Sequence, residues 1–314
     1  MKAATFDRYG STEVLSIAEV PDPRPGRAQV LVRVHAAALN PKDVLIRRGK
    51  FPLFDGVGFP KRVGYDWAGV VIGHGAGVSA PAIGARVFGM IQSWTAGACA
   101  ELLAANVDEL AVIPDGLAFE DAAAMPLASL TSLQALRDLA RVRPGDHVTI
   151  HGASGGVGVF AIPIAKALGA HVTTTSSDAN RALCASLGAD VALDYRVDAF
   201  TAPGRRCDVF YDVFGNQSFA KVRPVLAARG AYISTVPKPH VFFAHAATLL
   251  ARQRCRLVVV RSRAADLQQI ARWADTGALR AVIDSRFALA DIREAQARVE
   301  TRRARGKVIV RVLD

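Results

Sequence analysis

The chain has few of the residues that bind metals or form disulfides. Its 314 residues include four cysteines and seven histidines, dispersed along the chain, and no CxxC or CxxH spacing occurs. Structural zinc sites and disulfide frameworks both require such residues at short, recurring spacings. We therefore expect no bound metal and no disulfide scaffold. The cysteines are expected to be small buried apolar residues: Cys99, Cys184, Cys207 and Cys255.

Long apolar runs are also missing. No stretch of 18 or more residues lacks polar side chains, although a membrane-spanning helix needs about that length. The first ten residues, MKAATFDRYG, have the features of neither a signal peptide nor a transit peptide. We therefore expect a cytoplasmic protein with no membrane partner.

Positive charge is in excess but is not concentrated. The formal net charge is +11, and eight of the 39 basic residues are lysine. The one evident cluster lies near the end of the chain, at Arg302, Arg303, Arg305 and Lys307. Scattered arginines attract anions and adsorb polyanions at low salt. They do not form a defined surface that could recognise a nucleic-acid groove, so we expect no specific nucleic-acid partner.

The stretch from His147 to Ser177 carries the most specific pattern in the chain. It contains a β-prone run, a glycine-rich turn over 152–158, a run of helix formers and a second β-prone run. The N-terminus of a helix that follows such a turn binds a pyrophosphate through backbone N–H groups, and glycine lets the backbone approach closely. The sequence predicts a dinucleotide site here, with a plain glycine-rich loop as the alternative. The residues expected at the phosphates are Ser154, Gly155, Gly156 and Val157.

The end of the second β-prone run indicates which dinucleotide is bound. Sites that prefer NAD place Asp or Glu there, against the ribose 2′-hydroxyl. Here Ser176 and Ser177 leave room for a 2′-phosphate, and Arg181 follows within reach to supply charge. Asp178 is evidence against NADPH, because its carboxylate would repel the 2′-phosphate if it pointed inward. We predict NADPH; alternatively, the two serines form a polar turn that caps the next helix.

The order of elements predicts two domains in three segments. Residues 1–118 read as short β segments with turns, whereas residues 119–265 alternate strands and helices. Such alternation is typical of a doubly wound parallel sheet. Residues 266–314 add helix, strand, helix and strand, and we expect this tail to rejoin the first domain. The predicted fold class is therefore α/β, with a β-rich domain and a doubly wound domain.

Several motifs together resemble a known family. The resemblance is carried by ALNPKDVLIRRG (38–49), VGYDWAGVV (63–71), LASLTSLQAL (127–136), RPGDHVTIHGASGGVG (143–158) and RGKVIVRV (305–312). In this order they are similar to the medium-chain dehydrogenase/reductase superfamily, in particular its zinc-free, zeta-crystallin-like quinone oxidoreductase branch. The resemblance implies a GroES-like catalytic domain interrupted by a Rossmann NADP-binding domain, with the active site in the cleft between them. It also implies a homodimer that pairs through the apolar strand expected at 257–260.

The same comparison bears on the chemistry. Zinc-dependent members of the superfamily need a His-Glu pair where this chain has Gly64, Tyr65 and Asp66, and they carry a four-cysteine lobe that is missing here. A zinc alkoxide mechanism is therefore not expected. We expect hydride transfer from NADPH to a quinone or an α,β-unsaturated carbonyl, with chemistry largely supplied by the cofactor. The alternatives are an enoyl-thioester or haloalkene-type reductase, or a non-catalytic NADPH- or nucleic-acid-binding protein on the same fold.

The resemblance also suggests roles for residues near 40. Asn40 is the best candidate for a polar group that faces the substrate, and Asp43 and Arg48 are expected to orient it. Alternatively, Asn40 with Pro41 forms only a helix N-cap. Leu45 stands where several relatives carry a tyrosine, so the proton donor is left open.

For the cofactor, the resemblance implies backbone contacts from the glycine turn and side-chain contacts from several later positions. Thr131 is expected near the nicotinamide ribose or amide. Tyr195 is expected near the adenosine, unless it is an ordinary half-buried residue at a strand end. The remaining expected contacts line the nicotinamide pocket or reach it from the tail: Phe214, Ser234, Val236 and Lys307.

Overall fold

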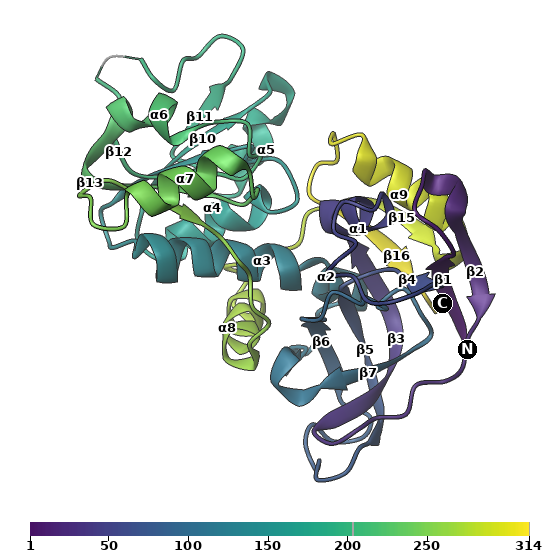
Figure 1. Cartoon of the computed structure of the whole chain (residues 1–314). Helices are drawn as coiled ribbons and strands as arrows, with labels where there is room; N and C mark the ends of the chain where they lie inside the picture. Colours follow the sequence, from purple (N-terminus) through teal and green to yellow (C-terminus); the bar gives the residue numbers. More distant parts are fainter. Residues whose placement is uncertain (203, 314) are drawn as a thin grey trace. The chain divides into compact units, whose positions relative to one another are not determined.

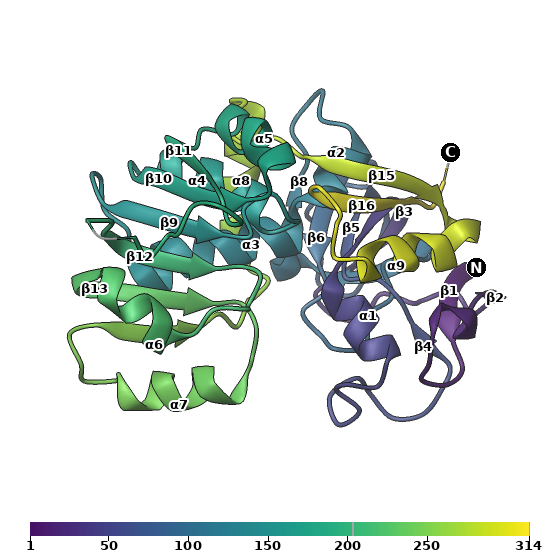
Figure 2. The same ribbon diagram turned by 90° about the horizontal axis from the view of Figure 1, so that it is seen from above.

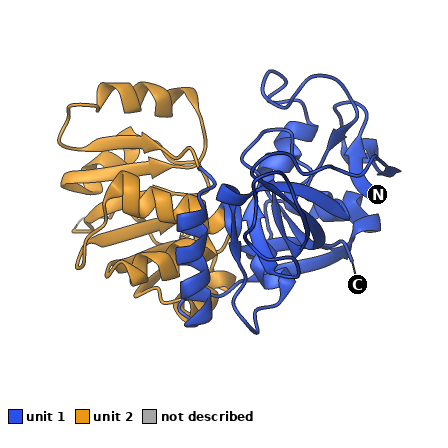
Figure 3. Cartoon of the chain, turned by 90° about the horizontal axis from the view of Figure 1, so that it is seen from below, with its two compact units in different colours: residues 1–127, 261–314 blue, residues 128–260 orange. Residues whose placement is uncertain are grey.

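The computed structural model describes residues 1–202 and 204–313 (Figure 1). The chain forms two compact units: residues 1–127 with 261–314 make unit 1, and residues 128–260 make unit 2 (Figure 3). Unit 1 is a GroES-like sheet domain and unit 2 a parallel-sheet, Rossmann-like domain, which confirms the predicted α/β fold class. Within the described residues, no helix is long and apolar enough to cross a membrane.

A seven-stranded sheet forms the centre of unit 1. Six strands follow the order β15-β16-β3-β5-β6-β8, and β7 also pairs with β3. The strands are β3 (Gln29–Leu39), β5 (Asp66–His74), β6 (Arg86–Met90), β7 (Leu102–Asn106), β8 (Leu110–Val112), β15 (Ile283–Ala288) and β16 (Lys307–Arg311). Period-two burial is clear in β3, where Val30, Val32 and Val34 are buried and Arg33 is exposed. The tail strand β16 pairs antiparallel with β3, with Val308 opposite Leu39.

A smaller sheet and a few helices complete unit 1. The small sheet has the order β2-β1-β4, from β1 (Lys2–Phe6), β2 (Leu15–Glu19) and β4 (Lys61–Arg62). The helices are α1 (Pro41–Arg47), α2 (Phe119–Ala124), α8 (Ala264–Asp275) and α9 (Ile292–Glu300). Single 3₁₀ turns occur at Thr12–Val14, Val107–Glu109 and Leu289–Asp291. Helix α2 packs on β3 and β5, and α9 packs on α1 and β16.

Unit 2 is built on a six-stranded parallel sheet. Its order is β11-β10-β9-β12-β13-β14. Figure 2 shows the labelled strands β11, β10, β9, β12 and β13 side by side in this order. The strands are β9 (His147–His151), β10 (His171–Ser176), β11 (Val191–Asp194), β12 (Cys207–Asp212), β13 (Leu226–Ser234) and β14 (Arg254–Leu257). The order reverses beside β9, and ligands of such sheets bind at that point, outside the carboxyl ends of the strands.

The connections of unit 2 are helical. They comprise α3 (Pro126–Leu133, whose first two residues belong to unit 1) with a π-helical continuation (Gln134–Ala140), α4 (Gly158–Ala167), α5 (Arg181–Ser186), α6 (Phe219–Val222) and α7 (Pro239–Ala247). Short 3₁₀ turns lie at Asp178–Asn180 and Arg223–Val225. Helix α4 runs through Pro163, which is buried inside it.

Candidate functional site

The start of α1 carries a buried polar network in unit 1. Asn40 directly precedes the helix, and its Nδ2 donates to Asp66 Oδ2 at 2.9 Å. Lys307 Nζ donates to Asn40 Oδ1 at 2.5 Å and to Asp66 Oδ2 at 3.0 Å. The other carboxylate oxygen of Asp66 accepts from the Leu127 backbone at 2.7 Å. All three polar side chains are buried, so Asn40 is engaged inside the protein at both ends of its amide.

Strand pairing explains why these residues meet. Ala38 lies opposite Asp66 across β3 and β5, and Val308 lies opposite Leu39 across β3 and β16. The ends of three strands thus bring Asn40, Asp66 and Lys307 together. The sequence analysis placed Lys307 at the cofactor; in unit 1 its ammonium is bound by Asn40 and Asp66.

Asp43 fastens the first turn of α1 to the segment before β5. Its Oδ2 accepts from the Asn40 backbone N–H at 2.8 Å, and its Oδ1 accepts from the Gly64 N–H at 2.9 Å. Burial raises the pKa of Asp43 to about 6, although these two hydrogen bonds lower it. The carboxylate therefore positions Asn40 through the backbone.

Arg48 lies at the opposite end of α1 from Asn40. Its guanidinium makes two 3.0 Å bonds to Glu300 on α9. The neighbouring Arg47 is completely buried and binds both Glu300 and Gln296. This ion-pair cluster ties α1 to α9, and it does not include Asn40.

A lysine packed against aromatic rings lies beside this network, and the sequence analysis did not single it out. Lys42 Nζ is 3.6 Å from the centroid of the Tyr65 ring and 4.4 Å from that of Trp94. Tyr65 is buried, and its hydroxyl donates to the Trp94 carbonyl at 2.7 Å. Phe51 and Phe54 pack on Trp94, with ring centroids 5.3 and 5.5 Å away. Burial lowers the pKa of Lys42 to about 8.

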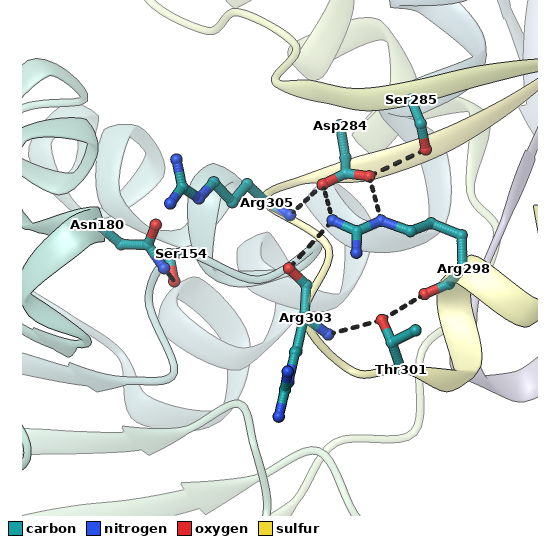
Figure 4. Close-up of polar contacts among 8 residues, drawn as sticks. All are labelled: Ser154, Asn180, Asp284, Ser285, Arg298, Thr301, Arg303 and Arg305. Atoms are coloured by element: carbon teal, nitrogen blue, oxygen red, sulfur yellow. Dashed lines mark hydrogen bonds and ion pairs between the residues drawn. The ribbon is translucent and has the colours of Figure 1, made fainter.

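The glycine turn of unit 2 requires glycine at specific positions. Gly152 has φ +81°, and a Cβ on Gly158 would lie 2.5 Å from the Ala153 carbonyl oxygen. Ser154 Oγ accepts from Asn180 Nδ2 at 3.0 Å (Figure 4). The Oδ1 atom of Asn180 is buried, and it has no hydrogen-bond partner in the part of the chain that the structure describes. A turn opening helix α4, with an unpaired acceptor beside it, fits a dinucleotide, whose phosphates accept and whose ribose hydroxyls donate hydrogen bonds.

His151 anchors the strand that leads into this turn. Its ring nitrogens lie 2.6 Å from Thr175 Oγ1 and 2.7 Å from Asn216 Oδ1. Burial lowers the pKa of His151, while the charge of Asp212 raises it. The neutral ring therefore links the carboxyl end of β9 to β10 and to the segment after β12.

The residues predicted around a 2′-phosphate follow β10. Ser176 is buried and donates to the Ser177 carbonyl at 3.1 Å. Arg181 Nε donates to the Ala192 carbonyl at 2.9 Å, and Arg181 Nη1 donates to Asp178 Oδ1 at 3.3 Å. The charge of Asp178 is thus partly offset by Arg181.

Tyr195 lies next to these residues, at the end of β11. Its backbone N–H donates to the Ser176 carbonyl at 3.1 Å, and its side chain is exposed. Arg196, which the sequence analysis did not name, places its guanidinium 5.9 Å from the Tyr195 ring. The turn after β11 therefore adds a second arginine to this end of the sheet.

The residues predicted at the nicotinamide lie at the carboxyl ends of β12 and β13. Phe214 follows β12, and its Cβ would be 3.0 Å from a Cβ placed on Gly152. Ser234 ends β13, and its Oγ accepts from the Val236 backbone at 3.2 Å. These positions share the sheet edge with the glycine turn, and Thr131 is buried in α3 of the same unit.

Metal-binding side chains do not gather in the described residues. Over 1–202 and 204–313, no three His, Cys, Asp or Glu side chains are placed to hold a metal ion.

Family models match both parts of the chain. The alcohol dehydrogenase GroES-like domain matches residues 26–134, and a zinc-binding dehydrogenase domain matches residues 187–310. Quinone-oxidoreductase QR1 of Triphysaria versicolor is 32% identical, over 99% of this chain and 98% of its own length. The 2-methylene-furan-3-one reductase of Solanum lycopersicum is 33% identical, over 99% of this chain and 79% of its own length.

Solved structures give the same assignment. The quinone oxidoreductase from Coxiella burnetii has a TM-score of 0.91 and 31% identity, with coverage of 100% of this chain and 99% of that one. The mycobacterial protein Rv1454c, complexed with NADPH, has a TM-score of 0.84 and 27% identity, with coverage of 99% and 100%. The chain therefore belongs to the medium-chain dehydrogenase/reductase superfamily, among relatives named quinone oxidoreductases, and is an oxidoreductase of a family that binds a nicotinamide cofactor.

Proposed function

We propose that this protein transfers a hydride from NADPH to a quinone or an α,β-unsaturated carbonyl, without zinc. The observation that carries the proposal is the ion pair of Lys307 and Asp66, in the stretch where zinc-dependent members place metal ligands. The ammonium lies 3.0 Å from the carboxylate, and Asn40 binds both groups. A buried carboxylate that already holds a cation is a poor metal ligand, so the acceptor must be electrophilic without a Lewis acid.

The cofactor preference rests on the residues after β10. No acidic side chain occupies the position of Ser176, and Arg181 offsets the carboxylate of Asp178. Arg181 and Arg196 offer charge to a 2′-phosphate, which strengthens hydrogen bonds to its oxygens. These features favour NADPH over NADH.

The chain's own residues bind and orient, and NADPH when bound supplies the hydride from its nicotinamide ring. Backbone N–H groups of Gly156 and Val157 face the pyrophosphate. The N–H of Gly155, which the sequence analysis also placed there, instead donates to the Gly152 carbonyl at 3.2 Å. Asn180 Oδ1 accepts from a ribose hydroxyl, which satisfies its buried lone pairs. Phe214 and Val236 form an apolar wall for the nicotinamide.

The test is NADPH and NADH oxidation, followed by absorbance, against 1,4-benzoquinone and but-3-en-2-one. A reaction without protein measures direct reduction of the acceptor, and protein dialysed against EDTA tests for a required metal. We expect faster turnover with NADPH, with undiminished activity after EDTA. Failure to reduce either acceptor overturns the proposal. If EDTA abolishes the activity and added zinc restores it, the reaction requires zinc and the claim that it proceeds without a metal is wrong.

We also propose that the protein is a homodimer joined through β14. This strand lies at one edge of the unit 2 sheet, and the nearby Val259 is 74% exposed. An open strand edge that continues into the apolar residues Val258, Val259 and Val260 favours pairing with a second copy. Sedimentation should give about twice the 33.3 kDa chain mass, Val259→Asp should give the monomer, and the control Val197→Asp, at the other sheet edge, should remain dimeric. A wild-type mass of one chain contradicts this proposal.

A further inference from the structure

We infer that Lys42 binds and protonates the oxyanion that hydride transfer leaves on the acceptor, an inference that rests on the proposed function. Lys42 is the second residue of α1, directly between Pro41 and Asp43. A cation at the N-terminus of a helix is opposed by the helix dipole. The ammonium is also partly buried and has no hydrogen-bond or ion-pair partner among the described residues. The aromatic rings and nearby carboxylates offset part of this cost, but they leave the N–H donors of Lys42 available to a ligand.

Two aromatic rings hold the ammonium in place. Its Nζ lies over the faces of Tyr65 and Trp94. Aromatic faces attract a cation but do not accept conventional hydrogen bonds, so the N–H groups of Lys42 can still donate to a ligand. We call Phe51, Phe54, Tyr65 and Trp94 the aromatic shelf. Trp94 and Phe54 are 37% and 61% exposed, so one side of the shelf is open to a ligand.

The shelf suits the acceptors proposed above. Quinones and enones are flat, conjugated and electron-poor, and aromatic side chains stack on such groups. Stacking on Trp94, whose ring centroid is 4.4 Å from Lys42 Nζ, brings the acceptor next to this ammonium. The ammonium of Lys42 then meets the oxygen of the acceptor that becomes negative.

Other donors near α1 are already engaged. The amide of Asn40 binds Asp66 and Lys307, and the buried ammonium of Lys307 binds Asn40 and Asp66. A donor stabilises a developing charge most when its position is preorganised and it makes no hydrogen bond within the protein. Lys42 meets this requirement, whereas Asn40 does not.

The charge state of Lys42 suits proton donation. Burial lowers its pKa to about 8, opposed by the charges of Asp43 and Asp66. A general acid works best when its pKa lies near the working pH. An arginine at this position would hold its proton permanently.

The step balances without another reactant. Hydride addition moves two electrons from NADPH to the acceptor and leaves a negative charge on its oxygen. One N–H bond of Lys42 breaks as an O–H bond forms, giving a hydroquinone or an enol and a neutral amine. The amine then takes a proton from water, and the enol relaxes to the ketone.

Three variants test the inference: Lys42→Met, Lys42→Arg and the control Lys50→Met, an exposed lysine. Single-turnover oxidation of NADPH isolates the reaction from product release. We expect Lys42→Met to slow it roughly 100-fold or more, with unchanged NADPH affinity. The wild-type rate should fall as pH rises through about 8, where Lys42 loses its proton. The rate of Lys42→Arg should not show this fall at alkaline pH. The rate and pH profile of Lys50→Met should match those of wild type.

A binding assay tests Lys42 without turnover. The probe is 4-nitrophenol, whose coloured phenolate imitates the hydroquinone anion. Wild type should bind the phenolate and lower its apparent pKa, and Lys42→Met should lose this effect. If wild type reduces acceptors while Lys42→Met matches it in rate, pH profile and phenolate binding, the inference is overturned and the function stands. If wild type reduces nothing but binds phenolate through Lys42, the oxyanion site stands and the proposed function fails.

Discussion

Lys307 lies 3.0 Å from Asp66, although 241 residues separate them in the chain. The pair is buried, and Asn40 bridges it by hydrogen bonds to both partners. It joins the last strand of unit 1 to β5 and holds Asn40 at the start of α1. This ion pair thus connects the stability of the tail to the geometry of the candidate site.

Replacing Lys307 by Met should destabilise unit 1. The change leaves the Asp66 carboxylate buried without a cation, and breaking a buried pair from one side costs about 3–5 kcal/mol. Thermal unfolding should show a lower midpoint for Lys307→Met, with Lys50→Met as the exposed-lysine control. Adding Asp66→Leu should recover part of the loss, because the unpaired charge is then gone. An unchanged midpoint in the single variant contradicts this account.

Asp43 should make stability depend on pH in an unusual direction. Burial raises its folded-state pKa to about 6 from a model value of 3.8, so the folded protein favours the protonated form. Its contribution is fully present below about pH 4 and is lost as pH rises through about 6. The expected change is about 1–3 kcal/mol.

The measurement compares thermal midpoints of wild type and Asp43→Asn between pH 4 and pH 7. Since asparagine does not titrate, wild type should lose stability relative to the variant as pH rises. A difference that stays constant, or that grows in favour of wild type, contradicts the raised pKa.

The fold was largely predictable because its signals are local. The period-two pattern of β3 and the strand–turn–helix pattern around Gly152 each require only neighbouring residues. The sequence analysis expected an apolar strand at 257–260, whereas β14 is Arg254–Leu257.

The site was predictable only in part because its contacts are long-range. Asn40 and Asp43 stood out through local motifs, but nothing local to Asp66 indicates Lys307 as its partner. Lys42 could be identified only from its contacts with the rings of Tyr65 and Trp94, which lie elsewhere in the sequence. Its position at the start of α1, against the helix dipole, was the one signal that sequence reasoning had available.

Arg181 should discriminate between the two nicotinamide cofactors. Replacement by Met removes a charge expected at the 2′-phosphate, which NADH lacks, and a charge-assisted hydrogen bond contributes about 1.5–3 kcal/mol. We expect NADPH affinity to fall roughly tenfold or more, with NADH affinity unchanged. Fluorescence titration measures both, with the exposed Arg206→Met as control. Equal weakening of both cofactors would place Arg181 away from the 2′-phosphate.

Two glycines of the turn should respond differently to alanine. A Cβ on Gly158 meets the Ala153 carbonyl oxygen at 2.5 Å, whereas the nearest atom to a Cβ on Gly155 is 3.5 Å away. Gly158→Ala must therefore shift the backbone, and it should lower both the thermal midpoint and NADPH affinity. Gly155→Ala fits the folded protein but places a methyl group where the pyrophosphate approaches. It should keep the midpoint and weaken NADPH binding by roughly tenfold or more, since 1.4 kcal/mol is a factor of ten. If Gly155→Ala binds NADPH as wild type does, the pyrophosphate does not lie against this glycine, and the binding role of the turn is wrong.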